Sequence, residues 1–289
     1  GEADEHEALE KLEELTFLSL LNYAEDNEDR FLFHPLLHEF AGELAKNRNL
    51  LEESKHQHAT HFIRILDERA GKRFAADLDD LVLASNWLQK IGKLGDAEKI
   101  CQQSLSYMTN DKQTVVLLNL LGSITQRQGK FNEAVHALRQ SMAIGQVLGD
   151  QQHQAMVLNS LGSVFQRMGR FDEATESFFK SYNLLVLLKN EQGQGMVLHS
   201  LGGVYQRQGK FDDAVKSFAQ SAEIGERLGD NRHLAMVYTA WGSALLRQHQ
   251  PAQAFAKLKR SFTIDEKMKN KRGMESVTPQ LYQALQQVS

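Results

Sequence analysis

The chain of 289 residues has an apolar fraction of 42% and a formal net charge of −4 at pH 7. This composition is typical of a soluble globular protein and argues against a disordered chain. Runs of about 18 apolar residues, which a membrane span requires, are absent, and the interspersed charges give no basic face for nucleic acid. We therefore expect a cytoplasmic protein without membrane or nucleic-acid partners. Cys101 is the only cysteine, so no internal disulfide can form.

Residues 1–48 are expected to contain two helices with a β-hairpin between them. Residues 7–18 have the pattern of an acidic amphipathic helix, and residues 19–34 show two short apolar runs around a polar loop, which is typical of a hairpin. A second helix is expected to open at Pro35. The first helix carries four glutamates and one lysine, a charge balance that would repel the phosphates of DNA.

These segments resemble the end of the winged-helix region of the signal-transducing STAND ATPases. The resemblance rests on the hairpin and on the sequences LTFLSLL and RFLFHPLLHEFA that flank its polar loop. A Met-His-Asp-type motif ends this region in the family, and Phe33-His34-Pro35 occupies its place here. The resemblance implies that His34 would contact the β-phosphate of ADP held by an upstream ATPase core. A cap at the junction of hairpin and helix is the structural alternative for His34.

The next two segments lead into the main part of the chain. Residues 49–74 are predicted as a linker helix, and residues 75–113 as a degenerate repeat whose first helix contains Leu81 and Leu88. Three small residues of this segment align with the following unit at an offset of 37: Gly92 with Gly129, Ala97 with Ala134, and Ser104 with Ser141.

A period of 40 residues governs residues 114–273. Four units align, with the sequences LLNLLGSITQRQGKF, VLNSLGSVFQRMGRF, VLHSLGGVYQRQGKF and VYTAWGSALLRQHQP beginning at residues 117, 157, 197 and 237. Such a period is typical of stacked supersecondary units, none of which buries its apolar face alone.

Within each unit the spacing predicts two antiparallel helices joined by a short turn. In the second unit one apolar stripe contains Leu158, Leu161, Gly162 and Phe165, and the partner stripe contains Phe171, Ala174 and Phe178. Gly162 would let the two helices approach closely, and Gly169 is predicted to end the first helix in a left-handed cap. Each unit is predicted to end at a residue pair whose second member is an N-cap: Gly149-Asp150, Lys189-Asn190, Gly229-Asp230 and Lys269-Asn270.

This pattern resembles the tetratricopeptide repeat. The family's spaced positions are matched by Leu198, Leu201-Gly202, Tyr205, Gly209, Phe211, Ala214 and Phe218. The length of 40 instead of 34 residues is similar to the longer repeats of kinesin light chains and bacterial peptide-sensing regulators. The resemblance implies an all-α solenoid of helical hairpins wound into a right-handed superhelix. The fourth unit departs from the pattern at His249 and Pro251, as terminal repeats do, and residues 274–289 are expected to form a capping helix.

A ladder of polar residues and methionines is predicted on the inner wall of this superhelix, opposite the apolar stripe. Side-chain amides pair with the backbone of an extended peptide, arginines bind carboxylates, and methionine adapts to apolar groups. The favoured ligand is therefore a protein or peptide, with an acidic or C-terminal segment bound extended. The alternative is that recent duplication left identical solvated residues. The predicted groove residues are Asn119, Gln126, Arg127, Met156, Asn159, Gln166, Arg167, Met196, His199, Gln206, Arg207 and Arg247.

No constellation of residues indicates catalysis. The chain has no Gly-x-x-x-x-Gly-Lys-Ser/Thr loop, and its histidines lack the acid of an HExxH site, so we predict no enzyme activity, no cofactor and no metal. The predicted function is a peptide-binding module, the C-terminal sensor or scaffold part of a STAND-type signalling ATPase. The alternative is a regulatory or assembly solenoid attached to a different upstream enzyme or transcription-factor domain.

Overall fold

A computed structural model describes residues 21–24, 27–33, 82, 85–86, 88–106 and 111–288. In the first part of the chain, strand β1 (Leu21–Ala24) pairs antiparallel with strand β2 (Asn27–Phe33). The helices expected on either side of this hairpin, His34 and the linker helix all lie outside the described residues. The winged-helix assignment therefore stays a prediction.

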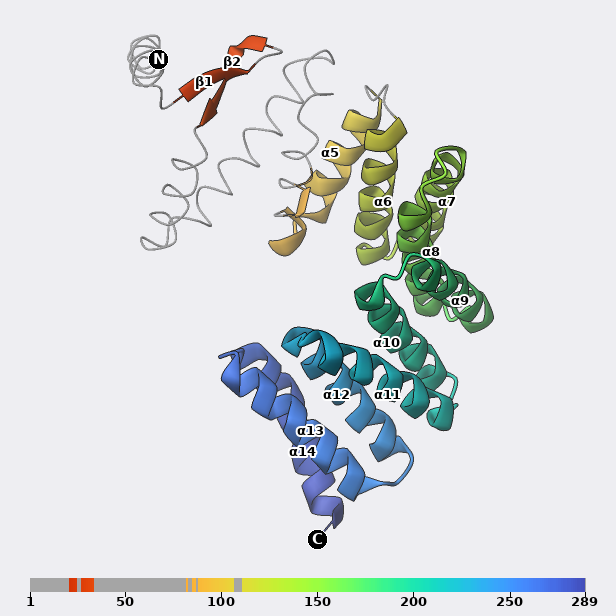
Figure 1. Cartoon of the computed structure of the whole chain (residues 1–289), viewed down its shortest axis with the longest axis vertical. Helices are drawn as coiled ribbons and strands as arrows, with labels where there is room; N and C mark the ends of the chain where they lie inside the picture. The colour runs from red at the N-terminus through yellow and green to blue at the C-terminus, as the bar shows by residue number, and fades with distance from the viewer. Residues whose placement is uncertain are drawn as a thin grey trace.

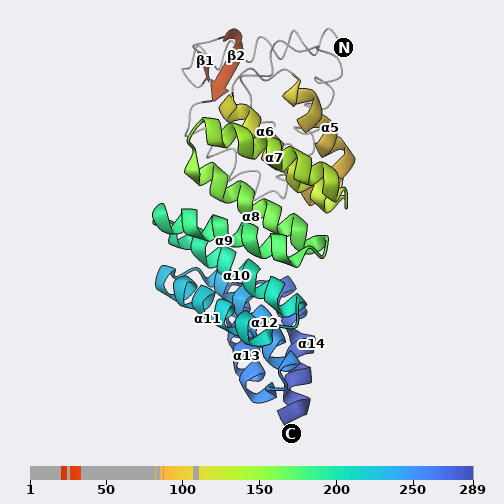
Figure 2. The ribbon, with the colours of Figure 1, turned by 90° about the vertical axis from the view of Figure 1, so that its right-hand side faces the viewer.

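From residue 94 onward the described chain is helical, and Figures 1 and 2 show the helices stacked in sequence order. α6 begins at Asp111 and α14 at Lys271, each three residues before the predicted bounds at 114 and 274. No helix in the described part of the chain is long and apolar enough to cross a membrane. The helices are α5 (Leu94–Leu105), α6 (Asp111–Arg127), α7 (Phe131–Val147), α8 (Gln151–Arg167), α9 (Phe171–Leu187), α10 (Glu191–Arg207), α11 (Phe211–Leu228), α12 (Asn231–Arg247), α13 (Pro251–Lys267) and α14 (Lys271–Val288).

The helices form hairpins, α6 with α7, α8 with α9, α10 with α11 and α12 with α13, and each hairpin packs on the next. The first helices of successive hairpins also contact one another, α6 with α8, α8 with α10 and α10 with α12, and α12 contacts α14. The array bends, as Figure 1 shows. Because the first helices are in mutual contact, they form the inner side of this bend.

Each hairpin is held together by a glycine that faces a large side chain of the partner helix. A Cβ atom added to Gly162 would lie 2.7 Å from the Cε1 atom of Phe178. The same contact recurs as Gly122 with Leu138, Gly202 with Phe218 and Gly242 with Leu258. The prediction that Gly162 permits close approach is confirmed, and the group that fills the space is the Phe178 ring.

The turns between hairpins alternate between two sequences. Gly149 and Gly229 have φ angles of 66° and 67°, whereas the equivalent Lys189 and Lys269 adopt 54° and 55° without being glycines. The predicted N-caps are confirmed, because each side chain accepts a hydrogen bond from a backbone N–H three residues on. These capping residues are Asp150, Asn190, Asp230 and Asn270.

The interfaces between hairpins alternate in the same way. Across the α7–α8 interface a Cβ atom on Gly145 would lie 2.8 Å from His153 Cδ2, and across the α9–α10 interface a Cβ atom on Gly193 would lie 2.7 Å from Leu185 Cδ2. A glycine on one helix thus accommodates a large residue on the other, and the roles exchange at each interface. The third and fourth interfaces place the glycines in the same order. A Cβ atom on Gly225 would lie 3.0 Å from Leu234 Cδ2 and 3.2 Å from His233 Cδ2, and one on Gly273 would meet the Asp265 side chain. The packing between hairpins therefore repeats every two units.

Four serines recur at the same position of the second helix in successive units. Ser141 Oγ donates a hydrogen bond to the Val115 carbonyl at 3.0 Å. Since this bond uses the hydroxyl proton, Ser141 accepts from His153 Nε2, at 2.7 Å. Ser181, Ser221 and Ser261 each bond in the same way to a carbonyl of the preceding helix, and Ser221 adds His233 at 2.9 Å. The serines link three consecutive helices wherever the histidine is present.

Replacing Gly162 with leucine should push the Phe178 ring out of its site and lower the free energy of unfolding by about 1–3 kcal/mol. Chemical denaturation followed by circular dichroism measures this change. Met156→Leu, an exposed substitution on the same helix, is the control and should leave stability nearly unchanged. Equal stability of the two variants would contradict the glycine contact.

The alternating interfaces predict a compensating pair of substitutions. Gly145→Leu alone should clash with His153, and His153→Gly alone should lose a buried hydrogen bond and open a cavity. The double variant recreates the Leu185 and Gly193 pair of the next interface, so it should be more stable than the sum of the single effects by about 1 kcal/mol or more. A double-mutant cycle of unfolding free energies tests this, and strict additivity would contradict it.

Candidate ligand groove

The first helices expose a row of methionines on the inner side of the array. Met156, Met196 and Met236 occupy the same position in three successive units, and their exposed fractions are 49%, 52% and 54%. Val116 stands at this position in the first unit. Buried packing between repeats does not account for these methionines, and their thioethers remain available to a ligand.

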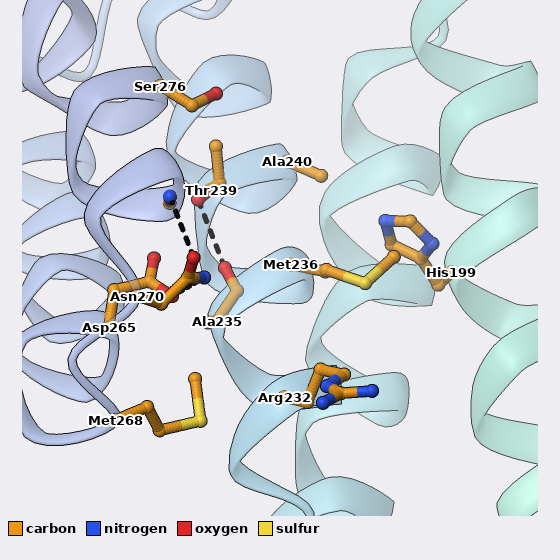
Figure 3. A pocket seen from close by; sticks show the side chains of 11 residues that line it. His199, Arg232, Ala235, Met236, Thr239, Ala240, Asp265, Met268, Asn270 and Ser276 are labelled. Carbon is orange, nitrogen blue, oxygen red and sulfur yellow. Dashed lines mark hydrogen bonds between the residues drawn. The ribbon is translucent and has the colours of Figure 1, made fainter. Parts of the chain in front are cut away.

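Two adjoining hollows lie along this row. The smaller, of about 300 Å³, is lined by residues of α8, α10 and α12, including Asn159 and Met196. The larger, of about 790 Å³, is lined by residues of α10, α12 and the junction of α13 with α14. Both hollows are lined by His199, Arg232 and Met236. Figure 3 shows the larger one, with the Met236 side chain extending from α12 toward His199.

His199 is a half-buried side chain on the wall of both hollows. Its ring centroid lies 5.7 Å from that of Phe218 and 6.2 Å from that of His233. Burial, followed by repulsion from His233, lowers the pKa of His199 to about 4. The ring is therefore neutral at physiological pH and presents an uncharged surface to the groove.

The five amide side chains predicted for the groove are all half-buried. Asn119 and Asn159 are half-buried, and their side-chain oxygens are buried without a hydrogen-bond partner among the described residues. Gln166 extends across to the next hairpin, since a Cβ atom on Gly203 would lie 3.2 Å from its Nε2 atom. Gln126 and Gln206 are half-buried at the equivalent positions.

The predicted arginine ladder is exposed, but it lies outside both hollows, at the C-terminal ends of the first helices. Arg127 donates hydrogen bonds to Gln89, at 3.0 Å to the carbonyl and 3.2 Å to Oε1. The Arg167 guanidinium lies 5.6 Å from the centroid of the Phe131 ring. Two of the four predicted arginines thus contact the preceding unit of the array. Arg207 and Arg247 form no such contact with a described residue.

Arg232 is a groove residue that the repeat pattern did not single out. Its position in the first turn of the helix is occupied by Lys112, Gln152, Gln192, Arg232 and Arg272 in successive units. Arg232 is exposed and lines both hollows. This position varies between amide and cation along the array, whereas the predicted ladder consists of arginines that are identical in all four units.

Reactive and metal-binding groups do not gather at the groove. Cys101 is fully buried beside Ser85, and burial raises the pKa of its thiol to about 11. Within the described ranges, no group of three or more His, Cys, Asp or Glu side chains is placed to hold a metal ion. The groups that the two hollows share are instead a methionine, a neutral imidazole and a guanidinium.

Stacked antiparallel hairpins with a hollowed inner wall define a helical-repeat solenoid. The family model described as Tetratricopeptide repeat matches residues 113–185 and 194–267, and the chain belongs to this family. Each matched segment spans about two of the 40-residue units. No curated relative matches the chain in sequence.

Solved structures similar to this chain include BtubC (BKLC) from P. vanneervenii, at 18% identity and a TM-score of 0.62, covering 76% of this chain and 91% of that one. A STAND protein with a tetratricopeptide repeat sensor from Pyrococcus horikoshii aligns at 12% identity and 0.63, covering 76% of this chain and 33% of that one. Aspartyl phosphate phosphatase F from Bacillus subtilis aligns at 11% identity and 0.55, covering 88% and 76%. At these identities the likeness shows the fold alone.

The lowered pKa of His199 predicts a specific loss of stability in acid. The pKa falls from 6.5 to about 4 on folding, so the unfolded chain binds the proton more tightly, and stability falls as the pH drops through this interval. The shifted pKa of His199 should lower the free energy of unfolding by about 3 kcal/mol between pH 7 and pH 4. His199→Asn, the residue of the first two units, should reduce this acid loss. His136→Asn, at an exposed site, is the control; superimposable pH profiles for the wild type and both variants would contradict the prediction.

Proposed function

We propose that this chain is a protein-interaction module that binds an extended peptide segment of a partner along its inner wall. The observation that carries the proposal is the pair of adjoining hollows that run from α8 to α14 beside the exposed methionines. A concave surface with apolar groups and few charges suits a peptide, because side chains enter the hollows while the remaining polar groups pair with the backbone. The solenoid fold supports the same role, since the stacked units create an extended concave surface.

The finer proposal is that the module is the sensor or scaffold part of a STAND-type signalling ATPase. Its supports are the Phe33-His34-Pro35 sequence, the paired strands before it, and the likeness of the array to a STAND protein with a tetratricopeptide repeat sensor. In this proposal His34 contacts the nucleotide of an upstream ATPase core. A P-loop encoded upstream of residue 1 would support it. A protease or a DNA-binding domain at that place would favour a regulatory solenoid, and the ATPase assignment would then be wrong.

Selection of a random heptapeptide phage library on the immobilised chain tests the interaction module. We expect enrichment of peptides that bind one site, with the protein remaining helical and monodisperse. Absence of enrichment, in a selection where a known peptide receptor succeeds, would contradict peptide binding.

The arginine ladder predicts acidic or C-terminal carboxylates in the selected peptides. Arg167→Ala with Arg207→Ala should weaken their binding at low salt without changing helicity, because both side chains are exposed. Isothermal titration calorimetry with the enriched peptides measures the change. Wild-type affinity of the double variant at low ionic strength would show that the ladder is a solvated face, as the duplication alternative holds.

A further inference from the structure

The two hollows meet at α12, where Arg232 and Met236 lie one helical turn apart and line both of them. We infer that this turn, together with Met196 and His199 of α10, is a specificity pocket for an extended peptide that carries a long apolar side chain and a carboxylate on the same side of its chain. The inference rests on the proposed function and names the ligand that its groove selects.

The apolar part of the pocket is formed by two methionines and one neutral ring. Met196 and Met236 are each about half exposed on adjacent first helices, and His199 lines the same hollow. Unbranched thioethers adapt to the shape of an incoming group, and a neutral imidazole adds surface without a charge to desolvate. A leucine, methionine or phenylalanine side chain of a ligand would cover these groups. A charged side chain would lose its hydration at this place without finding a partner.

Arg232 is the charge that remains for a ligand. Among the described residues it forms no ion pair, whereas the two carboxylates at the hollows are already engaged. Asp230 accepts a hydrogen bond from the His233 backbone N–H at 2.9 Å, and Asp265 accepts one from Asn270 Nδ2 at 2.7 Å. Asp265 is moreover only 4% exposed. A ligand carboxylate can therefore form a charge-assisted, two-pronged bond with Arg232 without displacing an internal partner.

The spacing of Arg232 and Met236 on α12 sets the spacing of the ligand residues that contact them. Positions four apart on a helix have Cβ atoms about 5–6 Å apart. In an extended peptide, side chains two residues apart point to the same side and are separated by about 6.6–6.8 Å. The two distances are close, so the ligand signature is an acidic residue and a long apolar residue separated by one position.

Peptides enriched from the random heptapeptide library are the probe. We expect them to share the acidic-x-apolar spacing, in either chain direction. Calorimetry should show that Arg232→Ala and Met236→Ala each weaken binding by about tenfold or more, as anchors of a small interface do. Replacing the peptide's acidic residue with its amide should cost affinity in the wild type but little in Arg232→Ala, because the two groups act on each other.

Two matched variants separate the pocket from general effects. Leu187→Ala removes an exposed apolar side chain of α9 that lies outside both hollows, and Lys259→Ala removes a cation that lines a separate hollow beside α11, α12 and α13. Both should bind within about twofold of the wild type. Enriched peptides without the signature, or binding that is equally sensitive to all four variants, would overturn the pocket while leaving peptide binding intact. A selection that enriches nothing would overturn both proposals.

Discussion

The contact between a first-helix glycine and a large side chain of the second helix is the constraint on which the rest of the array depends. A glycine inside a helix costs about 1 kcal/mol relative to alanine, so its recurrence at residues 122, 162, 202 and 242 has to be offset by packing. The side chains that fill these sites are all fully buried. By fixing one face of each first helix against its partner, the contact also fixes which face remains free. Residues 156, 196 and 236 lie on that free face, and the groove is therefore a consequence of how the hairpins close.

Much of this architecture could be predicted from the sequence, because the period of 40 and the apolar stripes each reflect a local rule. Caps such as Asp150 and left-handed turns such as Gly169 depend only on their immediate neighbours, and the structure has them where the sequence placed them. The alternation of the interfaces was harder to predict. The pair Gly145 and His153, and the pair Leu185 and Gly193 in which the glycine is on the other helix, are visible in the sequence. Their meaning depends on contacts between helices, which no periodicity specifies.

The residues that line the candidate site were only partly predictable from the repeat pattern. Identity between repeats singled out the arginines, and two of them, Arg127 and Arg167, contact the preceding unit. A side chain near the C-terminal end of a helix readily reaches carbonyls and rings of its neighbour, so these two arginines also support the stacking of the units. The hollows are instead lined by residues that depart from the repeat, His199 among asparagines and Arg232 after two glutamines. The hollows thus combine a position shared by three units, the methionines, with positions that differ between units, His199 and Arg232.

The groove and the alternating interfaces meet at one side chain. His233 bonds to Ser221 and thereby holds α12 against α11, and it also lines the smaller hollow, with its ring centroid 6.2 Å from that of His199. The equivalent positions at the second and fourth interfaces are glycines, which offer no such link. A group bound in the smaller hollow would therefore lie against the ring that joins the third hairpin to the fourth. Since each hairpin contacts mainly its neighbours, the angle between these two hairpins sets the direction of everything beyond them.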